Sequence, residues 1–301
     1  MPHDHGHHHG HGHAAGDGKL TAAVAVNILL TVVQIVGGLL SGSLALIADA
    51  IHNLSDALSL ILAFAARRIS RRKADGTMTF GWNRAELIAA LINLTALVMI
   101  ALYLAIEGLM RLADPPGVDG WIVIWIAAVA LVVDAATAAL TYRMSKDSLN
   151  IRAAFLHNLA DALGSVAVIL VGTLILLYDW RLLDPLATLG ISAYILWHAL
   201  AEMRPTIHIL MLGAPDAPDR EDIRSAFLAH PDIHEVHHLH LWQIDEKRSS
   251  CEARVTLAEE DLPRAPAIVG ELKAILSARF GIGHSTIEVE APQLGTGARA
   301  S

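Results

Sequence analysis

The chain has one cysteine, Cys251, among its 301 residues. A single thiol excludes a disulfide framework and a zinc cluster built from several cysteines. Charged residues are also scarce, at 17% of the chain, whereas a soluble globular domain has about 25%. The 22 Lys and Arg are outnumbered by 30 Asp and Glu, so the chain offers no strongly basic face. We therefore expect no nucleic-acid partner.

Apolar residues take the place of the missing charge. They make up 54% of the chain, and the 29 residues from Leu20 to Ala48 contain no charged side chain at all. A helix needs only about 20 residues to cross a bilayer. The composition therefore predicts an integral membrane protein in contact with lipid.

Breaks rich in Gly, Pro and charge divide the apolar part into segments, as such residues do between helices. Six transmembrane helices are predicted at residues 20–40, 43–66, 85–110, 120–142, 153–178 and 184–209. Among the loops between the spans, those after the second and fourth carry most of the Lys and Arg, which marks them as cytoplasmic. With six spans, both termini are then cytoplasmic as well. We expect a multi-pass protein of a bacterial cytoplasmic (inner) membrane.

The composition becomes that of a soluble domain after Gly213, where residues 213–301 hold 9 basic and 15 acidic side chains. Periodicity predicts helices at 219–229 and 263–280, and strands at 235–245, 251–257 and 284–290. This order indicates a ferredoxin-like α+β layer. The predicted domains are a disordered His-rich tail (1–18), a transmembrane domain (19–212), a cytoplasmic metal-binding and dimerisation domain (213–292) and a disordered tail (293–301).

Ionisable side chains inside membrane spans are costly and mark functional sites. Residues 52–56 read HNLSD in the second span, and residues 157–161 read HNLAD in the fifth. Residues four apart share one helix face, so His52 pairs with Asp56 and His157 with Asp161. Zinc accepts four such N and O ligands in a tetrahedron. The alternative is a set of polar residues that only hydrogen-bond between helices.

Two further features have a metal-related interpretation. Asp49 lies on the same helix face as His52 and Asp56, and we expect it to gate the site or to orient a ligand. Seven histidines occur among the first 13 residues. Such a tract binds zinc weakly at several sites. We interpret it as a tail that collects metal, and the alternative is a neutral low-complexity leader.

The chain resembles the cation diffusion facilitator family, from about residue 17 to 292. The resemblance rests on SLALIADA at 43–50 before the first HxxxD, on FGWNRAE at 80–86, on the second HxxxD, on HHLHLW at 237–242 and on TIEVE at 286–290. It implies a homodimeric antiporter that exports cytoplasmic zinc, or a related divalent ion, in exchange for protons. It implies no enzyme activity and no cofactor, with zinc as the substrate.

The resemblance also implies a cytoplasmic zinc site, in which zinc acts as a regulator. Its candidate ligands are His237, His284, Glu288 and Glu290. The chain departs from the pattern of its relatives at Arg254, where many have histidine, and at Glu288, where some do. The resemblance further places Arg84 at a hinge.

Two other classes of protein stay open at this stage. An intramembrane zinc hydrolase would use three protein ligands and a bound water, although the chain contains no HExxH motif. A membrane-anchored metal sensor would not need ligands inside its spans. Among substrates, cobalt, cadmium, nickel and iron are alternatives to zinc.

Overall fold

In a computed structural model of the chain, the described residues are 13–144 and 149–292, without the side chains of residues 13–24, 60, 140–141, 143–144, 149–154 and 157. The chain divides into two compact units, described separately below. The first comprises residues 1–64 and 92–202, and the second residues 65–91 and 203–301.

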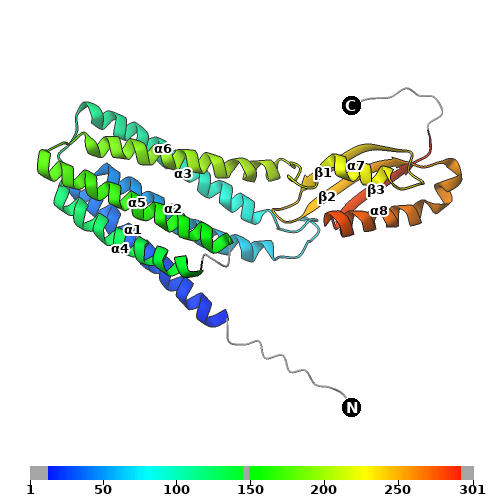
Figure 1. Ribbon diagram of the computed structural model, residues 1–301, viewed down its shortest axis with the longest axis horizontal. Coiled ribbons are helices and arrows are strands. Elements are labelled where there is room, and N and C mark those ends of the chain that lie inside the picture. The colour runs from blue at the N-terminus through cyan, green and yellow to red at the C-terminus, as the bar shows by residue number, and fades with distance from the viewer. Residues whose placement is uncertain (1–12, 145–148, 293–301) are drawn as a thin grey trace, which may run out of the picture. The chain divides into compact units, whose positions relative to one another are not determined.

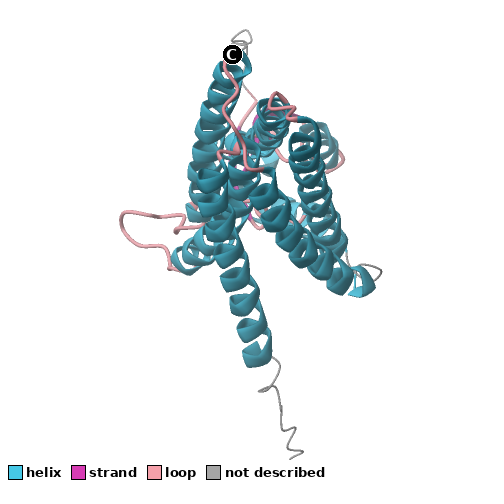
Figure 2. Ribbon diagram, turned by 90° about the vertical axis from the view of Figure 1, so that its left-hand side faces the viewer, coloured by secondary structure: helices cyan, strands magenta, loops and turns pink. Residues whose placement is uncertain are grey.

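Six long helices correspond to the six predicted spans (Figure 1). They are α1 (His13–Ser41), α2 (Leu44–Ser70), α3 (Ala85–Ala113), α4 (Gly120–Met144), α5 (Leu149–Tyr178) and α6 (Leu183–Leu210). Five of them have a described stretch that is long and apolar enough to cross a membrane, and α1 adds a shorter apolar stretch, Ala25–Ser41. Loops join the helices at their ends (Figure 2). The prediction of a mostly helical membrane protein is confirmed.

The start of α2 is defined by local chemistry. Gly42 has a φ of +76°, a conformation that glycine adopts without strain, and it separates α1 from α2. The hydroxyl of Ser43 then accepts the Leu46 N–H at 3.1 Å, as an N-cap does. The Asp184 carboxylate, from the first turn of α6, accepts the Ser43 hydroxyl and the Leu44 N–H at 2.5 and 2.8 Å. These bonds satisfy backbone donors that a helix N-terminus otherwise leaves unpaired.

Small residues allow close helix packing within the first unit. Gly120 of α4 and Gly172 of α5 lie so close that a Cβ on either would contact the backbone of the other. The buried side chains of Leu46, Val123 and Val168 pack together and join α2, α4 and α5. Close approach of backbones is the usual source of helix association inside a membrane, where lipid is as apolar as the side chains.

The second unit contains a three-stranded sheet with helices on one face. Its elements are α7 (Arg220–Leu228), β1 (Glu235–Gln243), β2 (Ser249–Thr256), the 3-10 helix η1 (Glu259–Arg264), α8 (Ala265–Phe280) and β3 (His284–Glu290). The sheet order is β1-β2-β3, antiparallel between β1 and β2 and parallel between β2 and β3. The predicted α-β-β-α-β order is confirmed.

One face of this sheet forms the apolar core of the unit. Buried side chains of α7 and α8, among them Phe227 and Leu272, pack against Val236, Cys251 and Val255 of the strands. Since side chains alternate along a strand, the polar side chains of β2 and β3 lie on the opposite face. The candidate cytoplasmic ligands occupy that polar face.

Candidate metal site

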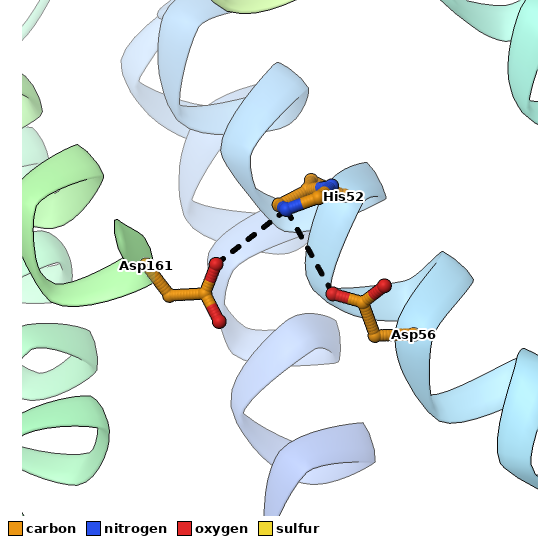
Figure 3. A group of neighbouring side chains, drawn as sticks. All are labelled: His52, Asp56 and Asp161. Atoms are coloured by element: carbon orange, nitrogen blue, oxygen red, sulfur yellow. Dashed lines mark ion pairs between the residues drawn. The ribbon is translucent and has the colours of Figure 1, made fainter. Parts of the chain in front are cut away.

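Two helices bring three of the predicted ligands together. His52 and Asp56 lie one turn apart on α2, and Asp161 reaches them from α5 (Figure 3). His52 Nε2 lies 3.8 Å from Asp56 Oδ2 and 3.5 Å from Asp161 Oδ1. Among the described side chains, this is the one group of three or more His, Cys, Asp or Glu whose ligand atoms all lie within 4.8 Å of one another.

These separations suit a small tetrahedral ion. Ligands that bind zinc at about 2.0–2.1 Å in a tetrahedron lie about 3.4 Å from each other. The separations of His52 Nε2 from Asp56 and from Asp161, 3.8 and 3.5 Å, are close to that value, and all three ligand atoms lie within 4.8 Å of one another. Two carboxylates also offset the charge of a divalent cation in a dry environment.

The three ligands differ in exposure. The side chains of His52 and Asp161 are 9% and 11% exposed, whereas Asp56 is 32% exposed. Asp56 lies one turn further along α2 than His52, in the direction of the C-terminal end of the helix. Asp56 is therefore the most accessible of the three described ligands.

The fourth predicted ligand is His157. It belongs to α5 and lies one helical turn before Asp161, but its side chain lies outside the described residues. The i,i+4 spacing that brings His52 and Asp56 together on α2 is the same as that of His157 and Asp161 on α5. His157 therefore stays a predicted ligand.

A polar network next to the site links α1 to α2. Gln34 Nε2 donates to Asp49 Oδ2 at 2.8 Å, and Asn53 Nδ2 donates to Gln34 Oε1 at 3.2 Å. All three residues are buried. The sequence singled out Asp49 but not Gln34, although a lone glutamine inside an uncharged 29-residue run is itself a signal.

An aromatic ring on α6 also borders the site. The ring of Tyr194 meets the His52 imidazole edge to face, with centroids 5.9 Å apart. The His198 ring stacks on Tyr194 from one turn further along the helix, at 6.2 Å. The contact of Tyr194 with His52 was not expected from the sequence, because no local pattern relates residues 142 apart along the chain. The stacking of Tyr194 and His198 follows from their i,i+4 spacing on α6.

The cytoplasmic candidates are not gathered around one point in the described chain. His237 Nε2 pairs with Glu235 at 2.8 Å, and the ring of His284 meets Phe80 at 5.3 Å. Arg254 binds Glu288 at 2.9 Å and Glu290 at 3.1 Å.

Arg254 of β2 is paired with a residue on each of the two neighbouring strands. Arg254 lies opposite His237 on one side and Glu288 on the other. Its hydrogen bond to Glu288 raises the pKa of Arg254 further above its ordinary value, so the guanidinium stays charged. A cation therefore stands between the histidine and the carboxylates that were predicted to share a zinc ion.

Cys251 has no metal-binding role in this fold. It is fully buried in the core of the second unit. Burial, with a smaller contribution from the neighbouring Glu252 charge, raises the pKa of the thiol to about 11. Zinc binds the thiolate, and at neutral pH this group is the thiol.

Both parts of the chain match known protein families. Residues 20–211 match the cation efflux transmembrane domain, and residues 215–292 match the cytoplasmic domain of cation efflux proteins. The metal-bound C-terminal domain of the CzcD transporter from Cupriavidus metallidurans is 29% identical and covers 24% of this chain and 99% of that domain. Its TM-score of 0.23 is too low to carry a structural argument.

Full-length relatives give the same assignment. The zinc transporter ZitB of Pectobacterium atrosepticum is 34% identical over 96% of this chain and 89% of its own length. A cadmium, cobalt and zinc/H(+)-K(+) antiporter of Bacillus subtilis is 34% identical over 86% of this chain and 84% of its own. These relatives are transporters and not enzymes. The chain belongs to the cation diffusion facilitator family of divalent metal cation efflux proteins.

Proposed function

We propose that the protein exports zinc from the cytoplasm in exchange for protons. The observation that carries this proposal is the cluster of His52, Asp56 and Asp161, whose ligand atoms all lie within 4.8 Å of one another. His157 is the proposed fourth ligand. The set of two imidazoles and two carboxylates suits zinc, since zinc binds nitrogen and oxygen ligands in a tetrahedron without a preference imposed by its d electrons.

Proton exchange follows from the same ligands. A metal binds deprotonated carboxylates and neutral imidazoles, so zinc binding releases protons and protons displace zinc. If the site opens in turn to each side of the membrane, a proton-rich exterior favours release of zinc there. The return step then carries protons inward. One set of side chains supplies both halves of the exchange.

The membrane setting supports the direction of export. The relatives named above are bacterial, and the basic loops after α2 and α4 argue that both termini are cytoplasmic. We therefore propose an inner-membrane protein with the C-terminal ends of α2 and α6 on the cytoplasmic side. The cytoplasmic domain matched over residues 215–292 supports a homodimer.

Two subsidiary proposals concern residues around the transport site and in the cytoplasmic domain. Asp49, held by Gln34, orients the part of α2 that carries His52 or gates access to it. Zinc regulation through His237, His284, Glu288 and Glu290 requires the two glutamates to leave Arg254. Zinc binding at that surface is thus coupled to loss of two ion pairs.

Zinc flux in proteoliposomes tests the main proposal. Vesicles with an acidic lumen are expected to accumulate zinc, and a protonophore that collapses the pH gradient should stop the accumulation. Vesicles without protein measure the passive leak of zinc across the bilayer. If the rate of zinc uptake is the same with and without the pH gradient, proton antiport is excluded. If vesicles with protein take up no more zinc than vesicles without it, under any gradient, zinc is excluded as the substrate.

A further inference from the structure

A cavity of about 410 Å³ lies in the second unit, where the end of α2, the start of α3 and the turn between β1 and β2 meet. Every residue that lines it belongs to that unit. Four of the lining side chains are basic, Arg67 and Arg71 from the end of α2 and Lys247 and Arg248 from the turn. The cavity therefore gathers cations from two parts of the chain that are far apart in sequence.

Hydrogen bonds fix the walls of this cavity to one another. The Ser70 hydroxyl donates to Glu86 Oε1 at 2.8 Å, which joins the end of α2 to the start of α3. The Arg84 guanidinium donates to the carbonyls of Ile244 and Gln243 at 3.2 and 3.3 Å, which joins the residue before α3 to the end of β1. The cavity is therefore framed by bonded segments of one unit.

Asp245 holds the turn that carries two of the cations. Its carboxylate accepts the N–H groups of Lys247 and Arg248, each at 2.9 Å, and pairs with the Arg248 guanidinium at 2.7 Å. Arg248 thus offsets the charge of Asp245, although both line the cavity. The Lys247 ammonium is left to face another partner.

The remaining charges of the lining have an excess of one positive charge. Arg67, Arg71 and Lys247 are exposed and form no ion pair with any residue that the structure describes. Two lining acids stand against them, Glu246 and Glu86, of which Glu86 is already hydrogen-bonded to α2. This excess favours an anion. The planar guanidinium of arginine suits phosphate in particular, because two of its N–H groups can donate to two phosphate oxygens.

The cavity lies at the depth in the membrane where lipid headgroups are found. The 20 residues of α3 from Leu87 to Ile106 contain no charged side chain. At about 1.5 Å per residue they measure about 30 Å, which is the thickness of the hydrocarbon core. Leu87 lines the cavity, so the cavity adjoins the edge of that core. Basic pockets at this level of membrane proteins bind the headgroups of anionic lipids.

We propose that this cavity binds the phosphate of an anionic phospholipid headgroup. Arg67, Arg71 and Lys247 donate hydrogen bonds to the phosphate, whose charge offsets the excess positive charge of the lining. The acyl chains stay in the bilayer, which favours this ligand over phosphate free in solution. The lipid bridges the end of a membrane span and the cytoplasmic domain. The proposal holds whichever ion the protein carries.

Lipid binding to the purified full-length protein in detergent micelles tests the proposal. Phosphatidylglycerol, titrated and counted by native mass spectrometry, should bind at least about fivefold more tightly than phosphatidylcholine, whose headgroup has a phosphate but no net charge. Equal affinities for the two lipids would overturn the proposal.

Variants of the basic segment separate a defined site from a general attraction of anions. Arg67→Gln and Arg71→Gln should each weaken phosphatidylglycerol binding by about fivefold, as should Lys247→Gln on the turn. Arg68→Gln is the matched control, because Arg68 neighbours Arg67 and is exposed but does not line the cavity. If Arg68→Gln weakens binding as much as the other variants do, the lipid senses only the charge of the segment and the cavity is not its site.

A variant that gains affinity cannot be explained by misfolding. Glu246→Gln removes an acid from the lining and should tighten phosphatidylglycerol binding by about twofold, since like charges in one site repel. Glu260→Gln changes an exposed acid of η1 outside the cavity and should leave the affinity unchanged. Unchanged or weaker binding by Glu246→Gln would contradict a phosphate in this cavity.

Competition distinguishes the two sources of phosphate. Inorganic phosphate and glycerol 3-phosphate, added at the concentrations at which the lipid saturates the protein, should displace little phosphatidylglycerol. If either displaces the lipid fully at these concentrations, the cavity is a site for free phosphate and the assignment to a lipid is wrong.

Discussion

Single side chains decide whether the proposed transport site can close on an ion. His52 and Asp56 share α2, and among the described ligands Asp161 alone comes from another helix. Its carboxylate therefore joins the two halves of the site and supplies one of its two negative charges. The geometry makes Asp161 the most informative position to change.

Asp161→Asn keeps the size of the side chain and removes its charge. We expect zinc transport in vesicles to fall by about 100-fold or more, because a dication that gives up its water needs both carboxylates. Asp179→Asn, at an exposed carboxylate that pairs with Arg181, should transport like the wild type. Wild-type flux in the Asp161 variant would remove this residue from the site.

His52→Asp addresses metal selectivity. The change replaces a nitrogen ligand by a carboxylate that can bind through two oxygens, and it adds a negative charge. Zinc prefers compact tetrahedral sites, whereas cadmium is larger and accepts more oxygen ligands at longer distances. We expect the ratio of cadmium to zinc flux to rise, with some zinc transport retained. An unchanged ratio with both fluxes measurable would mean that His52 does not select the metal.

At the scale of helices, the N-terminus of α2 depends on a partner from a different part of the chain. Asp184 accepts hydrogen bonds from Ser43, Leu44 and Ala45 while 1% exposed. The helix dipole also favours a negative charge at this position. The register of α2, and with it the position of His52, depends on this contact.

Asp184→Ala should therefore lower the melting temperature of the detergent-solubilised protein. Loss of a helix cap costs about 0.5–2 kcal/mol, and leaving buried donors unpaired costs about 1–3 kcal/mol. Asp119→Ala is the matched control, because Asp119 caps α4 through the Trp121 N–H at an exposed position. If the melting temperature of Asp184→Ala falls no further than that of Asp119→Ala, the buried cap adds nothing to stability beyond an exposed one.

At the scale of the whole molecule, the question is which segments belong to the transport machinery. The His-rich residues 1–12 lie outside the described residues, and α1 begins at His13. We interpret such a tract as a set of weak metal sites that raises the local zinc concentration and stays outside the alternating access of the spans.

Deleting residues 2–13 should thus raise the KM for zinc by no more than a few-fold and leave the maximal rate nearly intact. The comparison is made at matched protein density in vesicles, over a range of zinc concentrations that covers both KM values. Replacing the seven histidines by glutamine keeps the length of the segment and should give the same result. Complete loss of transport in both variants would place the segment within the machinery.

The sequence by itself determined the features that depend on neighbours along the chain. The six helices follow from the length of the apolar runs, and the elements of the second unit follow from their periodicity. The contact between His52 and Asp56 follows from the i,i+4 geometry of one helix. Such local relations hold in any fold that contains the helix.

Only the tertiary structure decided which distant residues meet. Asp184 and Ser43 are 141 residues apart, and nothing local indicates that one caps the helix of the other. Arg254 and Glu288 were read as departures from a zinc-binding pattern, but the pairing of β2 with β3 makes them partners. A buried polar group takes whichever partner the packing brings within hydrogen-bonding distance, and that packing is a property of the whole chain.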